Sequence, residues 1–387
     1  MSARRWGPVA AVAGWQVAAS LCFYSVFAAT AYFRDAFEIS RTLVGVLVTV
    51  AMVGYTVNLF PSGAAVDGFG ERRVMLGGLL GLSATAALVG LAPNYGLLLA
   101  AVFLLGAFYA TAMPASNRGI VNTAPPGRAG LAMGLKQIGV TLGSALAAII
   151  IAAVAALVLW RWGFGAIAAL GLLYALYFRV SYRGSDGHGR WAMPDLARLR
   201  GNRAYGRLVL AGGFLGAGVF TTVGYSLLYA NEAAGLSAAA AGVVLAGVQT
   251  TGSLGRLWAG MLADHLGRGR GAAIATAGLT GCAGLLCLAL ALGPHPVAAV
   301  ALLLGIGLTT LGATGVYYSC LTELVGPGEV GAATAGGQTA INIGGMLAPP
   351  VFGYLADTAG YPAGWLLLAA CGFAAAGLVL AIARGAG

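Results

Sequence analysis

Three basic residues lie within long apolar stretches of this sequence: Arg118, Lys136 and Arg256. A charged side chain in such a segment is costly unless it faces a cavity or a partner, so each is a candidate for binding an anionic group. Arg256 is the strongest candidate. It precedes Asp264 by eight residues, which places it about 12 Å from that end of a helix. Its planar guanidinium suits a carboxylate or nitrate; the open alternative is a structural arginine bonded to main-chain carbonyls.

The single lysine, Lys136, stands in a chain that otherwise uses arginine. This choice indicates that a compact or titratable cation is needed inside the segment. The alternative is a lysine near a helix end that pairs with an acid of a loop. Arg118 lies about one turn inside its own segment, so its side chain could also extend to the segment's polar edge.

Polar side chains recur at helical spacing within the apolar stretches. Spacings of three and four residues put each set on one face of a helix. Such faces line a water-filled cavity or join helices by hydrogen bonds, and sets at equivalent places near Gln137 and Gln338 favour the cavity. The candidate binding residues from these stripes are Tyr24, Asn58, Gln137, Tyr225, Tyr317, Gln338 and Asn342.

Acidic residues and histidines are absent from the middle of every apolar stretch. A buried carboxylate is the usual proton or cation site inside a membrane, so its absence weakens a cationic-drug carrier and favours anionic ligands. There is no nucleophile–base pair and no G-x-x-x-x-G-K-[ST] loop, so neither an enzyme nor a nucleotide-driven pump is indicated. The five cysteines have no metal-ligand spacing, and we expect neither a metal nor a cofactor.

The composition indicates a membrane protein. The chain has 387 residues, of which 8% are charged, and its mean hydropathy is +0.88. A soluble domain carries roughly 25% charge. Twelve apolar segments approach the length of about 20 residues that a transmembrane helix needs. They span residues 8–33, 43–62, 74–92, 96–121, 130–157, 163–179, 208–230, 238–262, 271–292, 296–321, 331–354 and 363–383.

Arginine placement sets the expected orientation. With the N-terminus in the cytoplasm, most loop arginines lie on the inside, and Arg34, Arg41 and Arg161 are the exceptions. This bias predicts a multi-pass protein of the inner (cytoplasmic) membrane with both termini cytoplasmic. The basic stretch 181–207 is then a linker that meets anionic lipid head groups. It gives no reason to expect nucleic acid as a partner.

The sequence also repeats itself. Gly63-Ala-Ala-Val-Asp67-Gly-Phe-Gly70 recurs as Gly260-Met-Leu-Ala-Asp264-His-Leu-Gly267. The repeat predicts an N-terminal six-helix bundle over 1–180 and a C-terminal one over 208–387. In transporters built from such parallel repeats, the substrate site lies near the middle of the membrane and the halves rock around it.

The repeated loops resemble the signature loop of the major facilitator superfamily, and the resemblance extends over the whole chain. It implies that Asp67, Arg72, Asp264 and Arg268 form a conformational latch rather than a substrate contact. The pattern departs from the family where Gly68 and His265 replace an arginine and where Glu71 replaces a basic residue. These departures put the usual strength of the charge cluster in doubt.

Three shorter runs resemble anion-transporting branches of that superfamily. The run from Gly252 through Arg256 to Asp264 is similar to helix 8 of monocarboxylate, oxalate–formate and nitrate porters, in which the arginine holds the anion. The run from Pro114 to Arg118 resembles the anion:cation symporters. The run from Gly130 to Val140 resembles helix 5 of bacterial facilitators of small anions.

These features together predict an all-α secondary active transporter of a small anion, such as a carboxylate, that works by alternating access. Proton symport, in which a charge pair or Lys136 titrates, and exchange against a counter-anion both remain open. The alternatives are proton-coupled efflux of a drug or neutral metabolite and a sensor that binds without transport. The expected partners are the substrate, protons or a counter-anion, and membrane lipids, and we expect a monomer.

Overall fold

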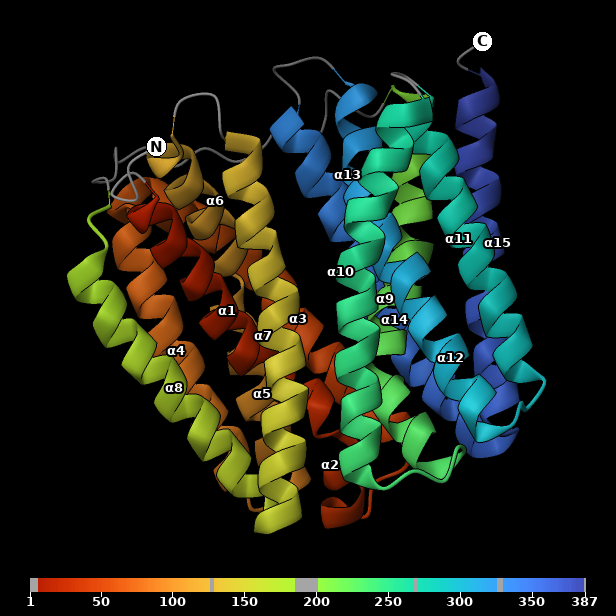
Figure 1. Ribbon diagram of the computed structural model, residues 1–387, viewed down its shortest axis with the longest axis horizontal. Coiled ribbons are helices and arrows are strands. Elements are labelled where there is room, and N and C mark those ends of the chain that lie inside the picture. Colours follow the sequence, from red (N-terminus) through yellow and green to blue (C-terminus); the bar gives the residue numbers. More distant parts are fainter. Residues whose placement is uncertain (1–5, 126–128, 185–200, 267–269, 326–329, 386–387) are drawn as a thin grey trace. The chain divides into compact units, whose positions relative to one another are not determined.

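The computed structural model describes residues 6–125, 129–184, 201–266, 270–325 and 330–385 (Figure 1). The regular elements in these ranges are all helices, which confirms the predicted all-α class. Eleven segments in the described ranges are long and apolar enough to cross a membrane. A further helix, α14 (Val330–Thr358), has 29 residues. The chain divides into two compact units, which we describe separately.

Unit 1 comprises residues 1–32 and 50–193. Helices α1 and α7 pack closely, and so do α4 and α8 (Figure 1). A Cβ at Gly143 on α7 would collide with the main-chain oxygen of Val17 on α1, so this glycine lets the two backbones approach. The helices of unit 1 are α1 (Gly7–Ala28), most of α3 (Arg41–Phe69), α4 (Glu71–Leu91), α5 (Tyr95–Tyr109), α6 (Ala112–Thr123), α7 (Ala129–Leu157) and α8 (Trp160–Ser181).

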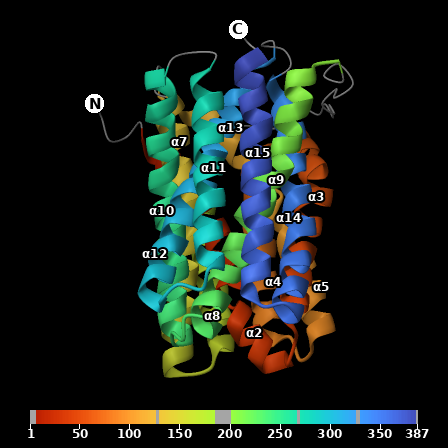
Figure 2. The ribbon, with the colours of Figure 1, turned by 90° about the vertical axis from the view of Figure 1, so that its right-hand side faces the viewer.

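Unit 2 comprises residues 33–49 and 194–387. Figure 2 shows α11 and α15 running side by side, and α14 packs on α9. Its helices are α9 (Arg203–Glu232), α10 (Ala238–Leu266), α11 (Gly271–Ala291), α12 (Pro296–Ile306), α13 (Gly312–Glu323), α14 and α15 (Tyr361–Gly385), with a π-helical turn, η3 (Gly307–Leu311), between α12 and α13. The short helix α2 (Thr30–Phe37) leads from unit 1 into unit 2.

Most of the predicted linker 181–207 lies outside the described residues, so its boundaries stay a prediction. Three predicted spans are interrupted, the first of them, 8–33, at Ala29 between α1 and α2. Residues Ala110 and Thr111 separate α5 from α6, and η3 separates α12 from α13. Pro114 lies in the first turn of α6, where a missing N–H costs no helical hydrogen bond. The breaks between α5 and α6 and between α12 and α13 occur beside the polar groups described below.

Ionic contacts hold residues 33–49 within unit 2. Glu232 forms ion pairs with Arg34 at 2.6 Å and with Arg41 at 2.8 Å, and it accepts a hydrogen bond from the Tyr361 hydroxyl at 2.9 Å. Asp357 accepts from the main-chain N–H groups at 41 and 42, at 3.1 and 2.8 Å. It therefore caps the start of α3 from another helix, because the first N–H groups of a helix have no partner within it.

Glu232→Ala is expected to lower the melting temperature of the purified protein, because Arg34 and Arg41 lose the carboxylate that they share. Leaving charged donors without a partner costs about 1–3 kcal/mol. Glu323→Ala is the matched control, since Glu323 is an exposed acid at the end of α13. Equal melting temperatures for the two variants would contradict a stabilising role for the Glu232 contacts.

Candidate functional site

Lys136 is fully buried on α7 in unit 1. Its Nζ donates to Asn117 Oδ1 at 2.7 Å and lies 3.6 Å from Met113 Sδ. Met113 and Asn117 are four residues apart on α6, so they share the face of that helix that meets α7. The break before α6 starts this helix at Ala112 and so sets the position of that face.

Helix α1 carries buried polar side chains that form a hydrogen-bond network with α5 and α6 in unit 1. Gln16 donates to Ser20 Oγ at 3.2 Å and accepts from Ser116 Oγ at 3.0 Å. Ser20 also shares a hydrogen bond of 3.1 Å with the Tyr109 hydroxyl. The ring of Tyr24 contacts that of Tyr109 edge-on, with centroids 6.1 Å apart. Tyr24, a predicted site residue, thus lies next to this polar network.

The other candidates of unit 1 have more local surroundings. Asn58 Nδ2 donates to the carbonyl of Gly54 within its own helix, at 3.0 Å. Gln137 Oε1 is buried without a hydrogen-bond partner in the described part of the chain. The structure therefore does not connect either residue directly to Lys136.

Arg256 on α10 is held by the interrupted helix of unit 2. Its Nε donates to the main-chain oxygen of Leu311, at 3.2 Å, and to Thr314 Oγ1, at 3.1 Å. A Cβ at the neighbouring Gly255 would collide with the carbonyl of Leu308, so the glycine allows α10 to lie directly on η3. These two bonds orient the planar guanidinium, a group whose parallel N–H bonds suit a carboxylate.

A chain of side chains continues from Arg256 across α13 and α14. Tyr318 interacts electrostatically with Arg256, and its hydroxyl donates to Gln338 Oε1. Gln338 Nε2 donates to Asn342 Oδ1 at 2.7 Å. Asn342 is fully buried, and its Nδ2 has no acceptor among the residues that the structure describes. We call Arg256, Thr314, Tyr318, Gln338 and Asn342 the Arg256 cluster.

Two predicted tyrosines direct their hydroxyls to main-chain carbonyls, although the ring of Tyr317 contacts that of Tyr318 edge-on, with centroids 5.5 Å apart. Tyr317 is fully buried and packs against Gly212, with its hydroxyl 3.5 Å from the Gly337 carbonyl. Tyr225 donates to the carbonyls of Arg41 and Pro349 at 2.5 and 3.0 Å. The structure thus brings Tyr318 into the cluster in place of Tyr317.

Arg118, a predicted binding residue, contacts a residue that was predicted for the latch. Its guanidinium pairs with Asp67, a predicted latch residue, at 3.1 Å. Arg72 donates instead to the carbonyl of Arg179 at 2.7 Å, at the end of α8. An arginine about one turn inside the membrane edge reaches this acid because its long stem extends toward the polar boundary. The side chain of Asp264 and all of Arg268 lie outside the described residues.

Sequence reasoning missed Thr314 and selected Tyr317 as a binding residue rather than its neighbour Tyr318. Thr314 and Tyr318 are four residues apart on α13, and this spacing is the signal that could have found them together. The face that α13 presents depends on η3, because a π-turn adds a residue to the helix and rotates the turns after it. The sequence contains no proline or other marker at this turn, so the choice between adjacent tyrosines was not determined.

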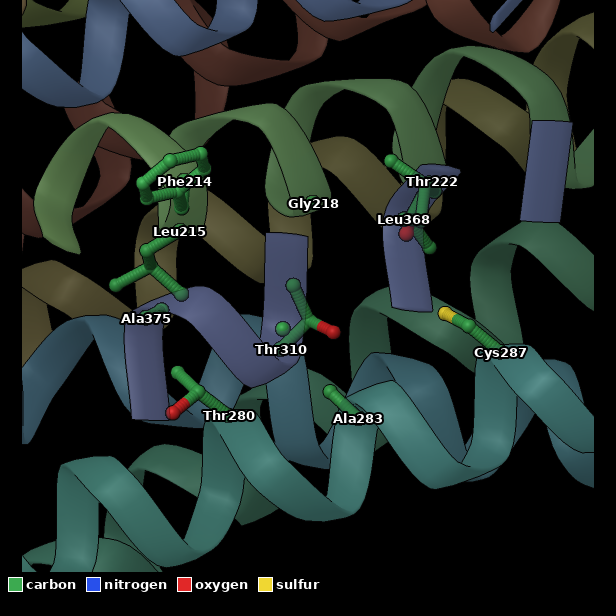
Figure 3. A pocket seen from close by; sticks show the side chains of 11 residues that line it. Phe214, Leu215, Gly218, Thr222, Thr280, Ala283, Cys287, Thr310, Leu368 and Ala375 are labelled. Carbon is green, nitrogen blue, oxygen red and sulfur yellow. The ribbon is translucent and has the colours of Figure 1, made fainter. Parts of the chain in front are cut away.

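A cavity of about 20 Å³ lies inside unit 2, among α9, η3, α11 and α15 (Figure 3). Thr222, Thr280 and Thr310 supply hydroxyls to a wall that is otherwise mostly apolar. Sites for small organic molecules measure about 300–1,000 Å³. This cavity has room for one water-sized molecule and is not the binding site of an organic substrate.

Two curated relatives match part of the chain. The uncharacterized transporter YybO of Bacillus subtilis (strain 168) is 25% identical over 171 residues, which cover 44% of this chain and 39% of that protein. The hexuronate transporter of the same organism is 26% identical over 152 residues, or 39% of this chain and 36% of that protein. The matched region thus spans less than half of each relative.

Solved structures match nearly the whole chain. A bacterial homolog of the human lysosomal transporter Spinster, in an inward-facing and unoccupied conformation, has a TM-score of 0.77 and 15% identity. The match covers 100% of this chain and 97% of that one. A mutant form of the nucleoside transporter NupG has a TM-score of 0.80 and 13% identity, with 97% and 99% covered. At these identities the likeness shows the fold alone.

The model of the Major Facilitator Superfamily matches residues 12–335 and 208–385. These two matches extend over most of the sequence, and they agree with the all-helical fold and the repeated loops. The chain belongs to the Major Facilitator Superfamily, whose members are multi-pass membrane transporters and not enzymes.

Proposed function

We propose that this transporter moves a small anion, such as a carboxylate, and that Arg256 is the residue that holds it. The observation that carries the proposal is the fixed guanidinium on a membrane-spanning helix. Leu311 and Thr314 engage Nε, which orients the rest of the planar group. An arginine inside a membrane protein marks an ion or substrate path by default. This arrangement supports recognition of a planar anion more than of a neutral or cationic compound.

The rest of the Arg256 cluster adds donors. Asn342 Nδ2 is a buried donor whose acceptor is missing within the described ranges, and leaving such a donor unsatisfied is costly. Gln338 and Tyr318 already satisfy one another. A carboxylate has only acceptors, so it would complement the guanidinium and this amide, and we propose that Tyr318, Gln338 and Asn342 belong to the binding site.

Acidic residues in unit 2 lie toward helix ends in the part of the chain that the structure describes. Glu232, Glu323 and Asp357 are at or near the ends of α9, α13 and α14. A cationic substrate would need a carboxylate deeper in the helices. The relative named a hexuronate transporter also supports an organic anion, and makes a hexuronate a suitable first substrate to test.

The remaining features complete the proposal. We place the protein in the cytoplasmic membrane with both termini inside, because the arginines of the predicted loops lie mainly on that side. We propose that the Asp67–Arg118 pair belongs to the conformational latch, which biases the equilibrium between the transport states. In this proposal the anion crosses the membrane when the protein changes from one of these conformational states to the other.

Counterflow in reconstituted vesicles tests the proposal. Vesicles loaded with an unlabelled anion are expected to accumulate the same labelled anion from outside, for at least one of glucuronate, lactate, oxalate, formate and nitrate. Empty vesicles and vesicles with a cationic dye are the controls. Counterflow of the dye alone, with none of the anions, would overturn the anion assignment and favour drug efflux.

A further inference from the structure

We propose that Lys136 takes up and releases the proton that is carried together with the anion, a role that rests on the proposed anion transport. The first support is its surroundings. The amine is fully buried, and its contacts within the described residues are an amide oxygen of Asn117 and the thioether of Met113. A buried ammonium without a carboxylate is costly, whereas a neutral amine can occupy the same place with the same hydrogen bond to Asn117.

The charged groups on neighbouring helices are engaged elsewhere. Helices α1, α6 and α8 pack against α7. On α6, Arg118 pairs with Asp67, so this carboxylate is committed to the arginine. On α1, the polar neighbour is Gln16, which bonds to Ser20 and Ser116.

Helix α8 contains no acidic residue, and its ionisable side chains are arginines and tyrosines. Its arginines lie near its two ends, where Arg161 donates to the carbonyls of Gly90 and Ala92. The tyrosines of α8 include Tyr174, which donates to the carbonyl of Ala11. No acid on these helices is therefore seen to fix Lys136 in its charged form, within the described part of unit 1.

The residue type is the second support. Of the 21 basic residues Lys and Arg in the chain, this one is the single lysine. Arginine stays protonated in proteins, while a buried lysine can lose its proton. A position that must alternate between neutral and charged forms excludes arginine, and the chain departs from arginine here alone.

The step is a simple protonation. The neutral amine accepts one proton to become an ammonium, the protein crosses between its two states with one anion bound, and the ammonium then releases the proton on the other side. One positive and one negative charge move together, so transport of a monovalent anion is electroneutral. The hydrogen bond to Asn117 persists in both forms, because either form of the nitrogen can donate it.

Measuring two transport modes distinguishes a proton-carrying role of Lys136 from a role in binding the anion. Counterflow exchanges labelled for unlabelled anion without net proton movement, whereas accumulation driven by a pH gradient requires it. Lys136→Met keeps the length and apolar stem but cannot bind a proton. We expect this variant to retain counterflow and to lose pH-driven accumulation at least about tenfold. Lys136→Arg, which stays charged, is expected to lose pH-driven accumulation as well.

Three results would overturn the inference while leaving anion transport in place. The first is a wild type that shows counterflow but no uptake driven by a pH gradient. The second is a Lys136→Met variant that keeps its pH-driven accumulation. The third is a Lys136→Met variant that loses both modes while Lys136→Arg keeps both, which is the result expected if Lys136 contacts the anion directly. Absence of anion counterflow in the wild type would instead overturn the proposed function itself.

A binding measurement serves if Lys136→Met does not fold. Adding the transported anion to purified wild type in weakly buffered solution should raise the pH by uptake of about one proton per bound anion. The folded Lys136→Arg variant should bind the anion without that change. Anion binding by the wild type with no proton uptake would contradict the role of Lys136.

Discussion

Replacing Arg256 with lysine is expected to lower anion counterflow by about 100-fold, because one charge-assisted hydrogen bond contributes about 1.5–3 kcal/mol. Lysine keeps the charge but cannot form two parallel N–H···O bonds, nor donate from an equivalent of Nε to Leu311 and Thr314. Arg256→Ala removes the charge as well and should lower counterflow further. Initial rates of labelled-anion uptake, normalised to protein in the vesicles, measure the effect.

The matched control is Arg203→Lys, the same substitution at an exposed arginine in the first turn of α9. It should transport like the wild type. If Arg256→Lys and Arg203→Lys gave the same rate, Arg256 would be a structural residue bonded to η3, the alternative that its contacts with Leu311 and Thr314 also permit.

Gly255→Ala is expected to destabilise the protein and to reduce anion transport together. The added methyl would occupy the position of the Leu308 carbonyl, so α10 must move away from η3. Overpacking of this kind costs about 1–3 kcal/mol, which corresponds to a melting temperature lower by roughly 2–12 °C for a bundle of this size. The displacement also separates Arg256 from Leu311. Thermal unfolding and counterflow measure the two effects.

Gly278→Ala is the control for that substitution. Gly278 lies in the middle of α11, and nothing lies within 4 Å of a Cβ built there. Alanine should leave transport unchanged and slightly favour the helix, because glycine is the poorer helix former. A Gly255→Ala variant as stable and active as Gly278→Ala would show that close contact between α10 and η3 is not needed.

The helical class and the family were predictable from the sequence because both depend on patterns that repeat. Apolar segments of membrane-spanning length leave few alternatives to helices, and the paired loops around Asp67 and Asp264 occur at equivalent places in the two halves. Arg256, Gln338 and Asn342 were selected from the sequence because their cost inside a membrane or their helical spacing marked them, and their role in binding stays a prediction.

The neighbours of these residues were less predictable, since they depend on local backbone geometry. The π-turn at Gly307–Leu311 rotates α13 and brings Tyr318, not Tyr317, toward Gln338. The break before α6 places Asn117 beside Lys136. Arg118 was predicted to bind substrate from its depth and from the resemblance of residues 114–118 to anion:cation symporters, and only the folded unit shows Asp67 within reach.

We propose that one residue recognises the charge of the anion and that another residue carries the proton. Arg256 stays charged and holds the anion, while Lys136 changes its charge. This assignment explains why one membrane-embedded cation is an arginine fixed by its Nε and the other a lysine with neutral contacts.

Equilibrium binding to the purified protein tests the claim about Arg256 most directly. The first ligand is the anion that shows counterflow. If this anion is a carboxylate, the second ligand is its neutral amide, which has nearly the same shape. The wild type and Arg256→Lys are titrated with each ligand. We expect the wild type to bind the carboxylate far more tightly than the amide, and Arg256→Lys to lose most of this preference. Equal affinity of the wild type for both ligands, or an unchanged preference in Arg256→Lys, would contradict this expectation.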